Sequence, residues 1–260
     1  MTAPVTVAEL RQAYMALMAG QFRTASPGLV TGGCGQETRW SGSTGRVLLV
    51  VGCMPGVGTS TVALALASHA EDARLVECAT VGSSGLCAAT SAEMGTVDGW
   101  LQGSRGPLLI ERRGDQVSSL SQLPTPAATA RPWTVLDCSW DVGVLATDLG
   151  WLGHLARTLP EVVLVTRPTV PGMRRLDMAL AVLGEERVHV VVVGVDRRRW
   201  PKSVEAASSP TVRQLRASGR VLSVASCPAL SVGGLSPDPL PDAAMAGIAD
   251  LFTALKGERP

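Results

Sequence analysis

Short apolar runs separated by helix-sized segments follow one another along the chain from residue 46 onward. Several of these runs are continuous rather than alternating, for example VLLVV at 47–51, VVLV at 162–165 and VVVVG at 190–194. Continuous apolar strands are typical of a parallel sheet whose two faces are both covered by helices. The alternation of strands and helices supports the same arrangement, because parallel neighbours need crossover connections. The pattern therefore predicts a three-layer α/β fold with a doubly wound, mainly parallel sheet.

The bounds of the expected elements follow from the apolar runs and from the helical spacing between them. The expected strands are 46–52, 74–78, 107–112, 133–138, 161–166, 188–195 and 220–224. The expected helices are 59–70, 143–158, 171–183, 204–217 and 241–256. Residues 114–132 lack periodicity and are rich in Ser, Pro, Ala and Thr, so we expect a surface loop there.

The chain before residue 46 has a different character. Residues 1–22 carry apolar side chains such as Leu10 and Leu17 at helical spacing, which predicts an amphipathic helix. Residues 23–45 are rich in Gly, Ser and Thr without periodicity, which predicts a flexible linker. The α/β domain is therefore expected to span 46–260. The N-terminal helix either packs on this domain or serves as a docking peptide.

Composition excludes several classes of protein. The formal net charge of the 260 residues is +1, so no overall field draws the chain to nucleic acid or anionic lipid. No run approaches the roughly 20 apolar residues that span a bilayer, and the first residues lack the features of a signal peptide. We therefore expect a cytoplasmic protein without a transmembrane segment. Six scattered cysteines without a CxxC pair, and only three histidines, argue against a zinc site or a disulfide framework.

A glycine-rich turn between the first expected strand and the first expected helix is the main chemical signal. Residues 46–67 are RVLLVVGCMPGVGTSTVALALA, which is the strand–turn–helix context of a Walker A phosphate-binding loop. The spacing from Gly52 through Gly58 to Ser60 fits GxxxxGK[ST], except that position 59 is Thr. Glycines let backbone N–H groups face phosphates, and the helix N-terminus adds a favourable dipole.

The missing lysine divides the interpretation. A charge-assisted hydrogen bond to phosphate is lost with it, which weakens nucleotide binding by about tenfold to over a hundredfold. One alternative is therefore a weak nucleotide site, and the other is a tight strand–turn–helix that holds no phosphate. In the first case the expected nucleotide-binding residues of the loop are Gly52, Gly56, Val57, Gly58, Thr59, Ser60 and Thr61.

The order of elements and the loop resemble the ParA/MinD group of deviant-Walker ATPases, which have a P-loop NTPase-like fold. The loop of that family is KGGxGK[ST][ST], and the aligned residues here are Met54 to Thr61. The resemblance covers about 46–256 and agrees in the glycines and in Ser60. Both family lysines are replaced, by Met54 and Thr59.

Two acidic positions extend the resemblance. The family's second strand ends in a DxD-like segment, where this chain has Glu77 and then Ala79. The family's Walker B strand ends in an Asp followed by Pro-Pro-Gly, and here WTVLDCSWD supplies Asp137 without the rest. The resemblance implies that Ser60 and Asp137 hold Mg²⁺ if nucleotide binds. It also implies that Glu77 belongs to the nucleotide site.

The resemblance implies a degenerate ATPase with very slow hydrolysis or none, and no catalytic residue is assigned. Active relatives dimerise around ATP, so a homodimer or another protein partner is expected. A closer similarity, to ParA/MinD-like proteins of mobile and conjugative elements in GC-rich Gram-positive bacteria, favours an adaptor in a conjugation, partition or secretion-type system. The alternatives are a weakly active ATPase that dimerises on nucleotide, and a DNA-binding accessory protein. For the cofactor the alternatives are weakly bound ATP or ADP with Mg²⁺, or none.

The third alternative depends on one basic cluster, RRRWPK at 197–202. Its cations and aromatic ring suit contact with a nucleotide, with DNA phosphates or with an acidic protein surface. The alternative is a solvated loop with the tryptophan packed on the core. The residues concerned are Arg197, Arg198, Arg199, Trp200 and Lys202. Trp140, beside the Walker B position, is a further candidate for a protein interface.

Overall fold

The computed structural model describes residues 40–256 apart from positions 71, 81 and 116. The expected N-terminal helix at 1–22, and most of the expected linker, lie outside the described residues. The strands are β1 (Arg46–Gly52), β2 (Ala73–Cys78), β3 (Ala92–Val97), β4 (Trp100–Arg105), β5 (Leu108–Arg113), β6 (Trp133–Cys138), β7 (Val162–Thr166), β8 (Val188–Gly194) and β9 (Val221–Ala225). They form one nine-stranded sheet in the order β3-β4-β5-β2-β6-β1-β7-β8-β9.

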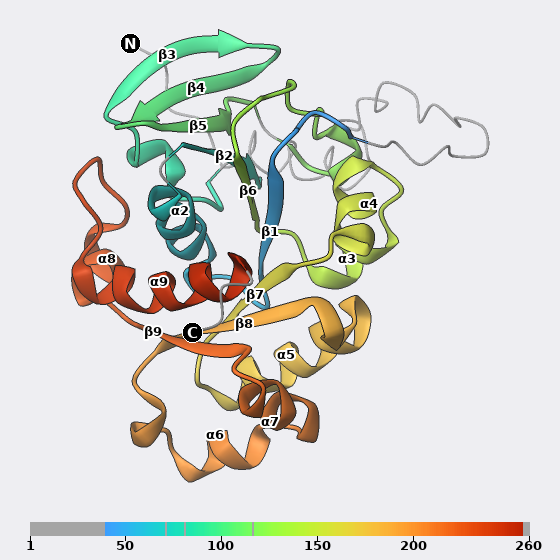
Figure 1. Ribbon diagram of the computed structural model, residues 1–260, viewed down its shortest axis with the longest axis vertical. Helices are drawn as coiled ribbons and strands as arrows, with labels where there is room; N and C mark the ends of the chain where they lie inside the picture. Colours follow the sequence, from blue (N-terminus) through green and yellow to red (C-terminus); the bar gives the residue numbers. More distant parts are fainter. Residues whose placement is uncertain (1–39, 71, 81, 116, 257–260) are drawn as a thin grey trace, which may run out of the picture. The chain divides into compact units, whose positions relative to one another are not determined.

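Eight α-helices occur in the described part of the chain (Figure 1). They are α2 (Thr59–His69), α3 (Val142–Thr147), α4 (Trp151–Thr158), α5 (Val170–Leu183), α6 (Lys202–Ala207), α7 (Pro210–Ala217), α8 (Pro228–Gly233) and α9 (Asp242–Lys256). Four 3₁₀ turns complete the described elements: η1 (Leu86–Ala88), η2 (Leu120–Gln122), η3 (Glu185–Arg187) and η4 (Arg197–Arg199). Within this part, no helix is both long enough and apolar enough to cross a lipid bilayer.

The seven strands expected from the sequence are the seven parallel strands of the sheet, and the predicted fold class is confirmed. β5, β2, β6, β1, β7, β8 and β9 pair in parallel with their neighbours. The sequence analysis missed the other two strands. β3 and β4 form an antiparallel hairpin that adds to β5 at one edge of the sheet. Its turn is Asp98-Gly99, where both residues have positive φ.

Two expected helices are each divided into two. The segment 143–158 forms α3 and α4, and the Asp148 carboxylate accepts a hydrogen bond from the N–H of Gly153 in α4. The segment 204–217 forms α6 and α7. Ser209 begins the second of these helices by accepting a hydrogen bond from the N–H of Val212 at 3.1 Å. Pro210 follows at the first helical position, where a missing N–H does no harm.

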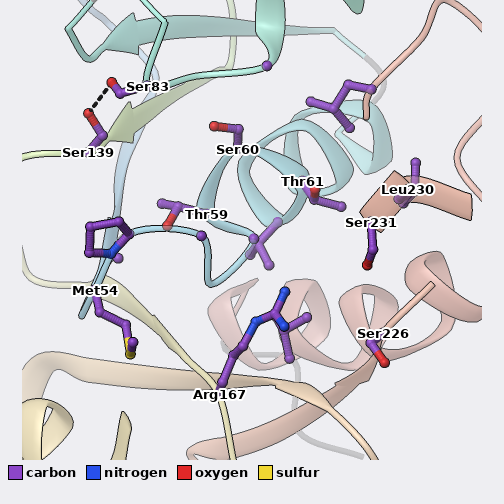
Figure 2. Close-up of a pocket in the computed structure, with 18 of the residues that line it drawn as sticks. Met54, Thr59, Ser60, Thr61, Ser83, Ser139, Arg167, Ser226, Leu230 and Ser231 are labelled. Atoms are coloured by element: carbon purple, nitrogen blue, oxygen red, sulfur yellow. Dashed lines mark hydrogen bonds between the residues drawn. The ribbon is translucent and has the colours of Figure 1, made fainter. Parts of the chain in front are cut away.

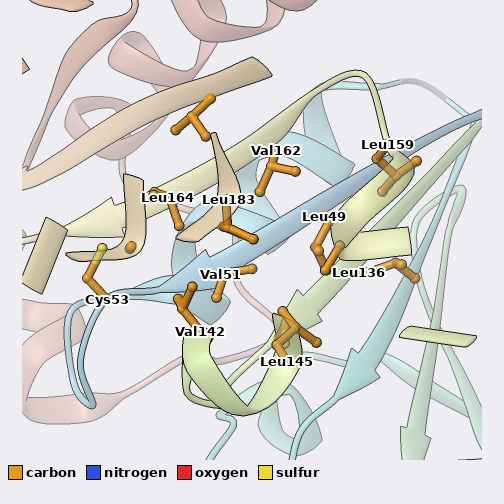
Figure 3. Close-up of a cluster of buried hydrophobic side chains, with 14 of the residues drawn as sticks. Leu49, Val51, Cys53, Leu136, Val142, Leu145, Leu159, Val162, Leu164 and Leu183 are labelled. Atoms are coloured by element: carbon orange, nitrogen blue, oxygen red, sulfur yellow. The ribbon is translucent and has the colours of Figure 1, made fainter. Parts of the chain in front are cut away.

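Helices cover both faces of the sheet, as the continuous apolar strands predicted. Leu48 and Val50 of β1 pack in the core beneath α2 and α9. Leu49 and Val51 point to the opposite face and pack against residues of α3, α4 and α5 (Figure 3). Successive side chains of a strand alternate between faces, so a strand that is apolar throughout needs a helical layer on each side.

Residues 40–45 are part of this domain, although we expected them in the linker. Trp40 is buried, and its indole N–H donates to the carbonyl of Pro126 at 2.9 Å. Its ring lies 5.6 Å from that of Trp151 in α4. The expected loop at 114–132 is also anchored, because Val117, Leu120 and Leu123 of that segment are buried in the same cluster as Trp40.

Candidate functional site

The carboxyl end of β1 lies where the connections of the sheet diverge. β1 is flanked by β6 on one side and β7 on the other, and ligands of doubly wound sheets bind at such a switch point. A cavity of about 800 Å³ lies here. Its walls come from the turn after β1, the start of α2, the ends of β2, β6 and β7, and the segment around α8 (Figure 2).

The turn after β1 has the backbone of a phosphate-binding loop. Gly56 and Gly58 have φ values of 72° and 97°, which residues with a Cβ rarely adopt. A Cβ on Gly52 would lie 2.4 Å from the Thr59 hydroxyl oxygen, so the side chain at position 59 folds back against the loop. α2 then begins without a capping side chain and without an acidic residue in its first turn. Its free N–H groups and its dipole are therefore available to an anion.

Most of the residues expected in this loop lie at the cavity. Those that line it are Gly52, Gly56, Gly58, Thr59, Ser60 and Thr61. Val57 does not: it is fully buried in the core under α2. Glu77 and Asp137 also lie behind the cavity wall rather than in it.

Asp137 is the most unusual ionisable group of the site. It ends β6 beside the loop, is fully buried, and neither carboxylate oxygen has a hydrogen-bond partner among the described residues. Burial raises the pKa of Asp137 to about 7. The Ser60 hydroxyl lowers the pKa of Asp137, but less than burial raises it. The negative charge of Glu77 raises the pKa further. The group lacks a positive partner.

This arrangement fits a divalent cation. Mg²⁺ is usually held by one or two protein oxygens, with waters and substrate phosphates completing its six ligands. An unpartnered buried carboxylate next to the Ser60 hydroxyl offers such oxygens, whereas an isolated buried charge is unfavourable. Ser60 and Asp137 are thus the residues that could hold the metal.

Glu77 has a partner and a different environment. It faces Asp137 in the parallel register of β2 and β6. Its carboxylate accepts a hydrogen bond from the backbone N–H of Arg113 at 3.1 Å. Burial raises the pKa of Glu77, and hydrogen bonding to Ser84 and Arg113 offsets part of this. The structure therefore places Glu77 beside the Mg²⁺ candidate residues but outside the cavity.

Two arginines that line the cavity were not among the residues expected at the site. Arg167 directly follows β7, and Arg175 lies in α5. Arg167 was not singled out at all, because it is isolated in sequence and approaches the loop only through the pairing of β7 with β1.

Hydroxyl groups line another part of the cavity. Ser83, after β2, and Ser139, after β6, share a hydrogen bond of 2.9 Å (Figure 2). On a different wall lie Ser226, which follows β9, and Leu230 and Ser231 of α8. The sequence analysis did not predict α8, whose six residues follow Cys227.

Comparison with solved structures identifies the architecture. The cell division ATPase MinD of Pyrococcus furiosus matches 83% of this chain and 100% of its own, with a TM-score of 0.55 and 13% identity. A chain of the MinC:MinD cell division complex of Aquifex aeolicus matches 83% and 97%, with a TM-score of 0.53 and 17% identity. A putative plasmid partition protein of Borrelia burgdorferi, bound to AMPPNP, matches 83% and 99%, with a TM-score of 0.50 and 11% identity. The domain has the ParA/MinD fold.

The ParA/MinD fold confirms the resemblance inferred from the sequence, as far as architecture is concerned. No protein-family model and no curated protein sequence matches the chain. The chain combines this fold with Met54 and Thr59 at the two positions that the sequence comparison aligned with the lysines of the ParA/MinD loop.

The basic cluster at 197–202 lies away from the cavity of this ParA/MinD domain, whose lining includes none of its residues. Trp200 is buried, and its indole N–H donates to the Val195 carbonyl at 3.0 Å. The guanidinium of Arg216 lies over its ring, and Arg197 pairs with Glu205 at 2.8 Å. The tryptophan thus packs on the core. The exposed residues that remain are Arg198, Arg199 and Lys202, and DNA contact through them stays a prediction.

Two other residues of the site have defined environments. Trp140 lines the cavity half-buried, and its indole N–H has no acceptor among the described residues. Its role in a protein interface stays a prediction. Cys53 of the loop is buried, and burial raises the pKa of its thiol to about 12. The reactive thiolate is therefore scarce at neutral pH.

Proposed function

We propose that this chain is a nucleotide-responsive adaptor. It binds ATP or ADP with Mg²⁺ weakly, hydrolyses ATP very slowly or not at all, and acts through a protein partner or a second copy of itself. The observation that carries this proposal is the phosphate-loop backbone, in which Gly56 and Gly58 lead into the uncapped start of α2 at the mouth of a cavity of about 800 Å³. A cavity of this size accommodates a small-molecule cofactor.

The metal part of the proposal depends on Ser60 and Asp137. When bound, Mg²⁺ would neutralise phosphate charge and orient the polyphosphate. The Asp137 carboxylate, whose pKa is near 7 without a cation, would ionise fully next to one. Metal and nucleotide affinity should therefore fall together as the pH drops below about 7.

Slow hydrolysis follows from the groups that surround the cavity. Asp141 is the acidic residue among those that line it, and its carboxylate caps α3 by accepting hydrogen bonds from Gly143 and Val144. Glu77 and Asp137 are buried behind the wall. The hydroxyls of Ser83 and Ser139 are too weakly basic to activate water. Asp141, whose Oδ1 is committed to the helix cap, is thus the one carboxylate among the described residues that line the cavity, which supports slow hydrolysis.

The solved structures support the nucleotide and partner parts of the proposal by analogy. The Borrelia partition protein was solved with AMPPNP, and the Aquifex protein in a MinC:MinD complex. We extend both properties to this chain on the strength of the shared fold. The proposal that the chain acts in a conjugation, partition or secretion-type system rests on the sequence resemblance.

Calorimetry tests nucleotide binding directly. Titration of Mg-AMPPNP and Mg-ADP into the wild-type chain should give saturable heat, weakened about tenfold or more by Ser60→Ala and Asp137→Asn. Ser68→Ala, at the exposed far end of α2, is the matched control and should leave the affinity unchanged. A wild-type chain that shows no binding at millimolar nucleotide would contradict the proposal. Fast phosphate release that depends on Ser60 and Asp137 would contradict slow hydrolysis.

A further inference from the structure

We propose that Arg167 supplies, within the same chain, the phosphate-binding charge that position 59 lacks, with Arg175 as a second cation on the same wall. This inference rests on the proposed nucleotide function and names a binding residue for it. Its starting observation is that both arginines line the cavity together with Gly58, Thr59 and Ser60.

The pairing of β7 with β1 places Arg167 next to the phosphate loop. Gly52, where the loop begins, is the register partner of Val165. The N–H of Cys53 then donates to the Val165 carbonyl at 2.9 Å, which continues the pairing into the turn. Arg167 follows two residues later. Figure 2 shows its side chain rising from the end of β7 towards the turn and the start of α2.

The backbone of Arg167 is fixed by its neighbours. Its carbonyl accepts a hydrogen bond from the Thr169 N–H at 2.8 Å. A Cβ on Gly194 would lie 2.6 Å from Pro168, so β8 packs closely against the next residue. A Cβ on Gly172 would lie 2.4 Å from the Arg167 carbonyl oxygen, so the first turn of α5 packs equally closely. The base of the side chain is thus preorganised on a rigid part of the domain.

The guanidinium, in contrast, has no partner. The side chains of Arg167 and Arg175 are exposed and form no hydrogen bond or ion pair with any described residue. The acidic residue of the cavity wall, Asp141, is already engaged as the cap of α3. The wall therefore combines two unpaired cations with the positive end of the α2 dipole.

An anion bound between these groups would be a partner for both guanidinium groups and for the free N–H groups at the start of α2. Guanidinium groups bind phosphate through paired charge-assisted hydrogen bonds, and helix N-termini bind it through backbone N–H groups. The nucleotide phosphates are the anions that the proposed function brings to this place. Loss of such a contact should weaken binding by about tenfold to a hundredfold.

The test compares neighbouring arginines of the full chain by calorimetry with Mg-AMPPNP, Mg-ADP and AMP. Arg167→Ala should weaken Mg-AMPPNP binding about tenfold to a hundredfold, Arg175→Ala less, and both should change AMP binding little. Arg174→Ala is the matched control, because Arg174 is exposed on the same helix as Arg175 but does not line the cavity. Unchanged unfolding temperatures establish that each variant is folded, and Arg167→Lys should restore part of the affinity.

A double-mutant cycle separates a phosphate contact from an indirect effect. Thr59→Lys restores the family lysine, so Arg167→Ala should cost clearly less in that background than in the wild type. Equal losses in both backgrounds, or wild-type affinity for Arg167→Ala, would overturn the inference while leaving nucleotide binding intact. A wild-type chain that binds no nucleotide would overturn the proposed function and the inference together.

Discussion

At the residue scale, an unusual feature of this domain is a buried carboxylate that has no hydrogen-bond partner among the described residues. Asp137 is buried, neither of its oxygens has a hydrogen-bond partner among the described residues, and burial raises its pKa to about 7. Folding therefore favours the protonated acid. Such a group lowers the stability of the free protein and is typical of a functional site.

Replacement of Asp137 should change how stability depends on pH. The pKa of Asp137 is about 7 in the native state and near 4 in the unfolded state. Between about pH 4 and about pH 7 the native state therefore holds a proton on Asp137 that the unfolded state has released. Wild-type stability should fall by about 1.4 kcal/mol per pH unit as the pH rises through this window, and level off above about pH 8. Asp137→Asn should lack this component. Urea unfolding of both proteins from about pH 5 to pH 8 measures the difference, and a difference that does not vary with pH would contradict the prediction.

The sequence predicted one part of the cavity lining better than another. The phosphate loop is contiguous, so its glycines and Ser60 could be placed from spacing alone, and Asp137 followed from the family resemblance. Arg167 and Arg175 reach the cavity only through the pairing of β7 with β1 and the packing of α5. Such contacts depend on strand order, which no local pattern in the sequence records.

At the element scale, errors arose where turn chemistry overrides apolar periodicity. Asp98-Gly99 is a strong hairpin signal, because both turn positions need positive φ. The flanking strands, however, are short and have no continuous apolar run, and β3 is exposed along its whole length. The divided helices follow the same logic. Asp148 and Ser209 offer side-chain oxygens to backbone N–H groups, which starts a new helix where apolar spacing alone suggests a continuous one.

A buried ion pair holds the hairpin side of the sheet to its parallel part. The Arg74 side chain in β2 donates to the Glu111 carboxylate in β5 at 2.7 Å, and both side chains are almost fully buried. Glu111 also accepts a hydrogen bond from Gln102 of β4 at 2.8 Å, and Arg74 donates to the Ala127 carbonyl. This ion pair thus connects β2, β4, β5 and the segment that contains Ala127.

Removal of one member of this pair should be costly. Glu111→Leu leaves a buried guanidinium without its counter-charge and should lower the free energy of unfolding by about 3–5 kcal/mol. The double variant with Arg74→Met should recover much of the loss, because no unpaired charge remains. Asp115→Asn, which breaks the ion pair between the exposed Asp115 carboxylate and Arg113, is the control and should change the free energy of unfolding little. Urea unfolding provides all three values, and a double variant as unstable as Glu111→Leu would argue against the charge explanation.

At the scale of the whole molecule, the position of Trp40 redefines where the domain begins. The expected start was residue 46, at the first apolar strand. A buried tryptophan, packed on Trp151 and bonded to Pro126, extends the domain at least to residue 40. Composition alone could not predict this, because an isolated tryptophan in a Gly- and Ser-rich segment has no periodicity.

Trp40→Ala should therefore destabilise the domain by about 3–5 kcal/mol, the cost of truncating a large buried aromatic side chain. Trp40→Phe, which keeps a ring but loses the hydrogen bond to Pro126, should cost less. The loss can be followed as a fall in thermal midpoint of about 2–4 °C per kcal/mol. A loss below about 0.5 kcal/mol for Trp40→Ala would place the boundary of the domain at residue 46 after all.

The irregularity in β3 has a consequence for self-association. The register of β3 against β4 shifts between Glu93 and Gly95, and Gly95 has a φ of 98°. The free N–H and C=O groups of this edge strand are therefore not in regular register. A strand from a neighbouring molecule cannot pair with them over a long stretch. This irregular edge therefore disfavours polymerisation through β3, although the apolar side chains of Met94 and Val97 are exposed there.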